Sequence, residues 1–180
     1  MRLPLLLCTF MAVIALTAAK AQTLPAATPV PEDAKSVDSV VSALYQVISG
    51  PAGEQRNWDR MRALFAPGAI MTSVGRRSDG RSGHRTISVE EYIKLSEPLM
   101  MKEGFFEKET ARKSQTFGDI VQVFTTYETK HNLTDKQVWM RGINGIQLVH
   151  SRGRWWILSI FWEDEGNGLT IPKEFSSGKH

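Results

Sequence analysis

Apolar residues recur with helical spacing in the first half of the chain and alternate as in strands in the second half. Spacings of three and four residues from residue 33 onward predict a helix that ends at Gly50-Pro51. A second helix is expected over residues 58–65, before Pro67-Gly68 breaks the pattern. The apolar residues of both helices gather on one side, which is the pattern of a helix that packs on a core.

A third helix is expected from Ser88 to about Lys102. Ser88 is a favourable N-cap, and Glu91 follows it in capping-box position. Pro98 lacks a backbone N–H, so we expect it to kink or split this helix. The residues expected to face inward are Tyr92, Ile93, Leu95, Leu99 and Met100.

The remaining segments have the pattern of strands. A short strand is expected at residues 69–74, followed by a basic loop at 75–84 and a brief strand at 86–88. Four longer strands are expected at 105–117, 120–131, 138–150 and 154–163, with Gly118-Asp119 and Arg152-Gly153 as tight turns. Helices first and an antiparallel meander last predict an α+β fold.

The tight turns also predict the register of the meander. Glu109 is expected to face Glu128, and Glu128 to face Arg141 on its other side. A slip of one residue would exchange the two faces of the sheet, because side chains alternate along a strand. The other expected pairs are Glu107 with Lys130, Thr110 with Tyr127, Thr125 with Asn144, Asn144 with Phe161, and Ile146 with Ser159.

On this register the two faces of the sheet differ. The first face has the composition of a small-molecule pocket, and we expect it to lie against the helices. It carries Val121, Val123, Thr125, Tyr127, Asn144, Ile146, Leu148, Ile157, Ser159 and Phe161. The second face has too much apolar surface to leave in water, so a symmetric homodimer is expected through it. The interface residues are expected to be Phe124, Trp156, Leu158 and Trp162.

The N-terminal residues predict an exported protein. Arg2 precedes an apolar run over residues 3–16, and Ala19-Lys20-Ala21 matches a signal peptidase site. We expect residues 1–21 to be a signal peptide cleaved after Ala21, which gives a periplasmic or secreted protein. The apolar run is shorter than a membrane span of about 20 residues, and no later run approaches that length. Residues 22–35 are expected to be a flexible leader rich in Pro and Ala, 36–171 a single domain, and 172–180 a C-terminal tail.

Loss of the signal peptide changes the charge of the chain. The formal net charge of +3 comes from 22 basic and 19 acidic residues, and removal of Arg2 and Lys20 leaves 20 basic residues. Without a net field or a basic stripe, a nucleic-acid partner is not expected. Cys8 is removed as well, so core packing rather than disulfides must stabilise the mature domain.

The chain resembles the nuclear-transport-factor-2-like superfamily, specifically its SnoaL-like and uncharacterised bacterial members. The resemblance covers residues 36–171 and rests on the order of elements and on two segments, NWDRMRALFAPGAIM and RGINGIQLVHSRGRWWILSIFWEDE. It implies a strongly curved antiparallel sheet that wraps around N-terminal helices as a cone with an internal pocket. Members commonly dimerise through the sheet. They include isomerases, dehydratases, cyclases and transport adaptors, so the fold does not name the activity.

The expected pocket leaves two functions open. One is an exported protein that binds a small, largely apolar molecule without catalysis. The other is a cofactor-independent lyase, isomerase or cyclase of the SnoaL-like or ketosteroid-isomerase-like kind. The residues expected to line the pocket combine apolar area with a few polar handles. They are Trp58, Phe65, Tyr92, Tyr127, Asn144, Ser159 and Phe161.

Each candidate catalytic residue also has a non-catalytic explanation. Tyr127 and Asn144 could donate hydrogen bonds to an oxyanion, or be buried polar groups satisfied by their neighbours. His84 could act as a base at the pocket mouth, or be an exposed loop residue. The resemblance implies an Asp or His base inside the cone, whereas the expected concave face offers no Asp and only Glu163 near its edge.

Two further groups of residues have side chains that could support chemistry. Glu109 opposite Glu128 could share a proton, or be neutralised by Arg141 and Lys130. The histidines lack helical metal-ligand spacing, and no Cys or His-x-Glu cluster accompanies them, so neither a metal nor a cofactor is expected. No Gly-x-Ser-x-Gly motif frames a nucleophile.

Overall fold

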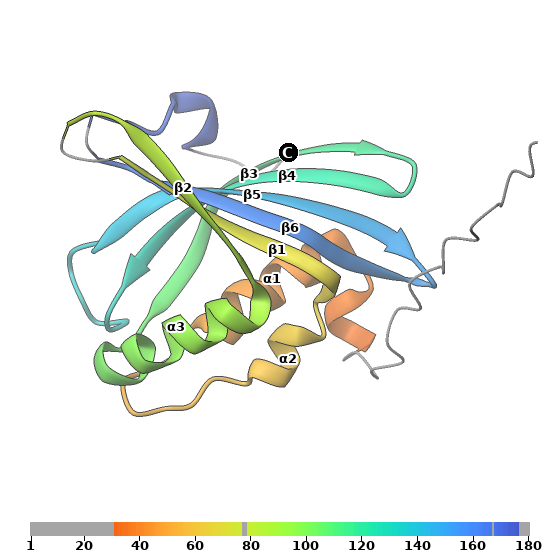
Figure 1. Cartoon of the computed structure of the whole chain (residues 1–180), viewed down its shortest axis with the longest axis horizontal. Coiled ribbons are helices and arrows are strands. Elements are labelled where there is room, and N and C mark those ends of the chain that lie inside the picture. The colour runs from red at the N-terminus through yellow and green to blue at the C-terminus, as the bar shows by residue number, and fades with distance from the viewer. Residues whose placement is uncertain (1–30, 77–78, 167, 177–180) are drawn as a thin grey trace, which may run out of the picture.

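The computed structural model describes residues 31–76, 79–166 and 168–176. The expected signal peptide and most of the expected leader lie outside these residues. The helices are α1 (Val37–Ile48), α2 (Trp58–Arg62) and α3 (Val89–Glu103), and Figure 1 shows all three on one side of the sheet. Two short 3-10 helices, η1 (Pro31–Ala34) and η2 (Lys173–Phe175), lie near the two ends of the described chain.

The sheet has six strands in the order β2-β1-β6-β5-β4-β3. All neighbours are antiparallel except β1 and β6, which run parallel, so the sheet is mixed rather than purely antiparallel. The α+β class is therefore confirmed, with a parallel pair that the turn signals could not reveal because its strands are distant in the sequence. The strands are β1 (Phe65–Arg76), β2 (Ser82–Ser88), β3 (Phe106–Phe117), β4 (Ile120–Lys130), β5 (Met140–Ser151) and β6 (Arg154–Asp164).

Helix α3 begins where its sequence predicts and ends within one residue of its expected end. The Ser88 side chain accepts a hydrogen bond from the Glu91 backbone N–H at 3.1 Å, which confirms the N-cap. The helix is continuous through Pro98, so of the two expected effects, a kink or a split, the split does not occur. Leu95 and Leu99 were expected inside but are 42% and 62% exposed. The face of α3 that packs on the core is thus narrower than its apolar pattern suggested.

The transition from α2 into β1 comes earlier than predicted. The helix ends at Arg62, and the Leu64 carbonyl already accepts a hydrogen bond from the Ile157 N–H at 2.9 Å. Pro67-Gly68 lies at an irregularity within β1 rather than at a helix end. Gly68 has φ 77°, a backbone conformation that glycine adopts without steric cost. The loop expected at 75–84 is also shorter, because β2 pairs with β1 from Ser82 onward.

The domain extends beyond both of its expected boundaries. Ala34 is 1% exposed, and the Asp33 carboxylate pairs with Arg60 at 2.7 Å, although both residues fell in the expected leader. Phe175 fell in the expected tail, yet its ring packs on Phe124 with centroids 5.7 Å apart. Short segments at each end therefore belong to the folded domain.

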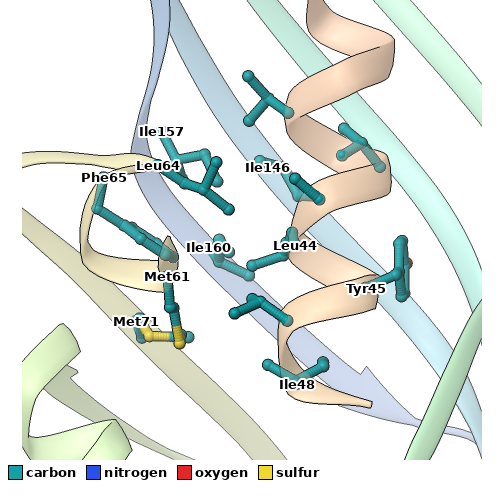
Figure 2. Close-up of a cluster of buried hydrophobic side chains, with 14 of the residues drawn as sticks. Leu44, Tyr45, Ile48, Met61, Leu64, Phe65, Met71, Ile146, Ile157 and Ile160 are labelled. Atoms are coloured by element: carbon teal, nitrogen blue, oxygen red, sulfur yellow. The ribbon is translucent and has the colours of Figure 1, made fainter. Parts of the chain in front are cut away.

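The main core lies between the helices and the sheet. Figure 2 shows Leu44 of α1 beside Ile160 of β6, with Met61 and Met71 nearby. Burial of such side chains stabilises the domain by about 1.5–3 kcal/mol each. No cysteine is available in the described part of the chain, so this packing supplies much of the stability.

Two β-bulges set which side chains face the helices. In β3, Ala111 pairs with Thr126 and Glu109 with Tyr127, so Thr110 is an extra residue. In β6, Leu158 is the extra residue, since the pairs on either side are Ile157 with Leu148 and Ser159 with Gln147. Each bulge reverses the alternation of the strand beyond it.

The bulges explain which register predictions were right. Both tight turns are confirmed, as are the pairs Glu128 with Arg141 and Thr125 with Asn144 between β4 and β5. The pairs beyond each bulge were wrong by one residue. Lys108, not Glu109, faces Glu128, which removes the expected carboxylate pair. The other observed pairs are Glu107 with Thr129, Phe106 with Lys130, Asn144 with Trp162, and Ile146 with Ile160.

Candidate functional site

A cavity of about 200 Å³ lies between α1, α3 and the sheet and opens to solvent on one side. Its apolar wall includes core residues from the helices and from β1 and β6, namely Leu44, Ile48, Met61, Met71, Met100 and Ile160. Five aromatic residues also line it, namely Tyr92, Phe105, Tyr127, Trp139 and Trp162. The polar lining residues are Ser96, Glu103, Glu107, His131 and Asn144. A mostly apolar wall with a few polar groups is the usual composition of a ligand site.

Two polar groups of the cavity, Glu107 and Asn144, belong to one hydrogen-bonded network. Asn144 on β5 donates from Nδ2 to the Tyr45 hydroxyl at 3.1 Å, and this hydroxyl lies 2.9 Å from Thr125 Oγ1. The same Nδ2 lies 3.5 Å from Glu107 Oε1. Thr129 donates to the other carboxylate oxygen of Glu107 at 3.2 Å. Residues from α1, β3, β4 and β5 are thereby joined around one carboxylate.

Glu107 has an unusual electrostatic environment. Burial is the largest effect and disfavours the charged carboxylate, which raises the pKa of Glu107 to about 7. The hydrogen bonds from Thr129 and Asn144 favour the charged form but only partly offset burial, and the nearby Asp164 charge raises the pKa further. A carboxyl group in this state can both accept and donate a proton near neutral pH.

Tyr127 forms a second polar pair beside this network. Its hydroxyl donates a hydrogen bond to Asp164 Oδ1 at the end of β6. Burial raises the pKa of Tyr127, and the hydrogen bond to Asp164 acts in the same direction. Gly142 makes room for this arrangement, because a Cβ there would lie 2.3 Å from the Tyr127 hydroxyl. The hydroxyl is therefore held neutral and its position is fixed by the backbone of β5.

Aromatic rings form the opposite wall and the mouth of the cavity. Tyr92 of α3 packs edge-on against Trp162 with ring centroids 6.2 Å apart. At the mouth, Trp139 packs edge-on against Phe105 at 6.4 Å and stacks on the His131 ring at 4.2 Å. Trp139 is 53% exposed, so the mouth presents an indole to solvent.

A wider groove of about 990 Å³ runs between α1 and β3, and Glu107 lines it as well. Arg112 lies in this groove, where it is bound to Glu109 at 2.6 Å and also forms an ion pair with Asp38. The guanidinium is thus already neutralised by two carboxylates. Glu107 is adjacent to this groove but is not a partner in these ion pairs.

The structure brings together three of the seven expected pocket residues. Tyr92, Tyr127 and Asn144 line the cavity. Trp58 and Phe65 belong to the hydrophobic core, where the Trp58 indole N–H donates to Glu97 at 2.9 Å. Ser159 and Phe161 lie beyond the Leu158 bulge and therefore face the other side of the sheet. Ser159 donates there to the Gln147 side chain at 2.8 Å.

The expected catalytic candidates separate in the same way. Tyr127 and Asn144 lie in the cavity, whereas His84 lies beside Phe161 in a shallow hollow on the other face of the sheet. Glu163 also faces away from the cavity and lies 3.7 Å from Arg76. Neither His84 nor Glu163 can therefore act on a molecule held in the cavity.

The residues expected at a dimer interface are also divided between the two faces. Trp162 lines the cavity, because the Leu158 bulge turns it inward. Trp156 lies on the outer face but is 5% exposed, since the Arg154 guanidinium covers its ring at 3.6 Å. Phe124 packs on Phe161 and Phe175, whereas Leu158 is 43% exposed.

Sequence reasoning missed Glu107, which is the central polar group of the cavity. The turn-based register placed it on the outer face opposite Lys130, and only the Thr110 bulge turns it inward. The sequence of β6 did contain one signal of a bulge. Inward-facing residues of a regular strand are two positions apart, whereas the apolar Ile157 and Ile160 are three apart, which is the spacing that one extra residue produces. No comparable signal marks the bulge in β3.

The described residues contain no cluster of three or more His, Cys, Asp or Glu side chains that could hold a metal ion. Within residues 31–76, 79–166 and 168–176, no helix is long and apolar enough to cross a membrane.

Comparisons with known proteins identify the fold. Searches found no matching family model and no matching curated protein. Among solved structures, the chain is similar to a Nostoc punctiforme protein of unknown function with a cystatin-like fold, with TM-score 0.56, 10% identity, and 73% and 90% of the two chains covered. It is also similar to a nuclear-transport-factor-2-like protein of unknown function from Pseudomonas putida, with a TM-score of 0.53 and 10% identity. The match covers 78% of this chain and 89% of the other. The chain has the nuclear-transport-factor-2-like, or cystatin-like, fold.

Proposed function

We propose that this protein binds a small, largely apolar molecule in the cavity between α1, α3 and the sheet. The observation that carries the proposal is the lining itself, an apolar and aromatic wall with Glu107, Asn144 and Tyr127 gathered at one part of it. Such a lining would hold an apolar body by burial and orient a polar head by hydrogen bonds. The cone shape implied by the family resemblance agrees with a ligand enclosed on several sides.

A cavity-filling variant tests the binding proposal. Ser96 faces the cavity from α3, so Ser96→Phe would place a ring in the space that a ligand would occupy. Benzyl alcohol is a suitable probe, and Trp139 and Trp162 in the cavity wall would report its binding by fluorescence. We expect Ser96→Phe to weaken binding at least tenfold, whereas Lys94→Phe on the exposed side of the same helix leaves it unchanged. An equal response in wild type and Ser96→Phe would refute the proposal.

A second candidate function is cofactor-independent proton transfer, as in a lyase, isomerase or cyclase. Glu107 favours it, because a carboxyl group with a pKa of about 7 can take a proton from carbon and return it at another position. Tyr127 and Asn144 lie close enough to the same cavity to stabilise an enolate oxygen. In the observed network both side chains already have hydrogen-bond partners, which is why binding is the leading proposal.

Deuterium exchange tests this second function without knowledge of the substrate. A small ketone such as cyclohexanone should exchange its α-hydrogens in heavy water faster with the protein than without it, as followed by proton NMR. Glu107→Gln should abolish the enhancement, and Tyr127→Phe should reduce it by about tenfold or more. Glu163→Gln, on the other face of the sheet, is the control. No exchange above the buffer rate would remove this candidate.

We also propose that the protein acts outside the cytoplasm. The support is the apolar run over residues 3–16 followed by Ala19-Lys20-Ala21, which lies outside the described part of the chain. N-terminal sequencing of the expressed protein should give Gln22 as the first residue, and a chain that retains its N-terminal apolar run would contradict export by cleavage.

A further inference from the structure

The lining of the cavity has an acidic character. Among the described residues that line it are two carboxylates and neither Lys nor Arg. Glu103 lies at the end of α3 and is paired with Lys102 at 3.3 Å. Glu107 lies deeper in the cavity and takes part in none of the ion pairs observed between described residues. The uncompensated charge in the cavity is therefore that of Glu107.

The basic residues closest to Glu107 on β3 and on the neighbouring strand β4 are engaged elsewhere. Lys108 pairs with Glu128 at 3.3 Å on the other face of the sheet. Arg112 is bound by Glu109 and Asp38, as described above. Lys130 donates to the Asp135 carbonyl at 2.5 Å. None of these cations is placed to neutralise Glu107, so a positive group would have to come from a ligand.

Glu107 also keeps capacity to accept hydrogen bonds. An ionised carboxylate has about four acceptor positions. The two side-chain donors that reach Glu107 are Thr129 and Asn144, and their distances of 3.2 and 3.5 Å are long for charge-assisted bonds of about 2.7–2.9 Å. A ligand with several N–H donors would complete this set of hydrogen bonds.

The cavity wall is suited to a cation as well as to an apolar group. Tyr92, Tyr127 and Trp162 surround the interior, and Phe105 and Trp139 lie toward the mouth. Aromatic faces attract ammonium groups, by about 0.5–1 kcal/mol when exposed and about 2 kcal/mol when desolvated. The same rings pack well against an apolar body. An acidic group within aromatic walls is the arrangement that recognises amines.

We propose that the ligand of this cavity is a small apolar amine, whose ammonium group binds Glu107 while its apolar body packs against the aromatic wall. The inference rests on the proposed binding function and specifies its ligand class. A cavity of about 200 Å³ corresponds to roughly seven water molecules at about 30 Å³ each, which limits the ligand to a small molecule. Benzylamine is small and carries an ammonium group on an apolar ring.

Binding of an amine would depend on pH through Glu107. The titratable groups around it are Tyr45 from α1, Tyr92 from α3, Tyr127 from β4 and Asp164 from β6. Burial raises the pKa values of all three tyrosines, so they stay neutral throughout the neutral range. His131 lines the same cavity nearer the mouth. Amine affinity should rise as Glu107 ionises, and His131→Gln should keep that rise.

The experiment compares three probes of one shape and three charges: benzylamine, benzyl alcohol and benzoate. Their affinities are measured by tryptophan fluorescence at about pH 8, where amine and carboxylate are both charged. We expect benzylamine to bind wild type at least tenfold more tightly than benzyl alcohol, and benzoate to bind most weakly. Glu107→Gln should remove the amine preference, whereas Glu103→Gln, which removes the carboxylate at the end of α3, should retain it. Near-ultraviolet circular dichroism establishes that both variants are folded.

The outcomes separate this inference from the binding proposal. If benzyl alcohol binds as tightly as benzylamine, or if Glu107→Gln keeps the amine preference, the amine inference is overturned and the binding site stands. If none of the three probes changes the fluorescence, both proposals fail. In wild type alone, an amine affinity that does not rise between about pH 6 and pH 8 would also overturn the inference, independently of any variant.

Discussion

Glu107 is held where ionisation is costly. Its carboxylate leaves water for a cavity wall of tyrosines and core residues, and the hydrogen bonds from Thr129 and Asn144 do not fully replace hydration. An acid whose folded pKa lies above its unfolded value binds protons more tightly in the folded state. Its ionisation therefore destabilises the fold as pH rises from about 4.5 to about 7, and the full cost is present above this range.

Glu107→Gln should remove this pH dependence. The pKa of Glu107 is raised from 4.5 to about 7, so ionisation costs the wild-type fold up to about 3 kcal/mol at alkaline pH. The variant should be more stable relative to wild type at about pH 8 than at about pH 4.5, so the difference in unfolding free energy, variant minus wild type, should be larger at about pH 8 by roughly 2–3 kcal/mol. Urea unfolding at both pH values measures this difference. If the unfolding free energies of the variant and of wild type differ by the same amount at both pH values, burial does not disfavour the ionised form of Glu107.

At the scale of the strands, the two bulges decide the chemistry of the cavity. Without the extra Thr110, Glu107 would lie on the outer face of β3, and without the extra Leu158, Ser159 and Phe161 would replace Ile160 and Trp162 inside. Bulges often occur where a strand must re-aim a side chain toward a site. Here they place a carboxylate and an indole in the same cavity.

The same two bulges decide which residues can be placed correctly from the sequence. Tyr127 and Asn144 were placed correctly because the β4–β5 pairing has a regular register. Ser159 and Phe161 were misplaced because turn-based register assumes unbroken alternation. Helix α3 was predicted from its N-cap and apolar pattern, and Tyr92 was correctly expected to face inward. Glu107 could not be predicted, since nothing in the residues around Thr110 distinguishes a bulge from a regular strand.

Deletion of Leu158 tests the role of the bulge. With regular alternation restored, one part of β6 must turn its inward residues outward, so Ile160 and Trp162 or the residues before them lose their burial. We expect a loss of about 3–5 kcal/mol in unfolding free energy or a failure to fold, because each large apolar side chain contributes about 1.5–3 kcal/mol. Thermal unfolding followed by circular dichroism measures it.

Leu158→Ala is the matched control for that deletion. It keeps the extra residue and removes only a side chain that is 43% exposed, so it should cost about 1 kcal/mol or less. A deletion variant as stable as Leu158→Ala would show that the register of β6 is not set by the bulge.

At the scale of the whole molecule, the outer face of the sheet is partly covered by the chain itself. Phe175 of η2 packs on Phe124, and its carbonyl accepts a hydrogen bond from Thr126 Oγ1. Lys113 lies 5.0 Å from the centre of the Phe175 ring. The apolar surface that suggested a dimer is therefore smaller than its sequence pattern implied, because an intramolecular partner covers part of it.

A symmetric dimer through the remaining outer face stays a prediction, now with different anchors. Leu158 and Ile70 are 43% and 46% exposed and lie on neighbouring strands, since Ile70 pairs with Ser159. Two such patches related by a two-fold axis would cover each other.

If this is the interface, Leu158→Glu buries a charge against an apolar surface and should convert the dimer to a monomer in size-exclusion chromatography with light scattering. Phe117→Glu changes a residue that is 83% exposed at the β3–β4 turn, away from these strands, and should leave the mass unchanged. A wild-type mass equal to one chain at every concentration would contradict the dimer and leave the cavity of a single chain as the whole functional unit.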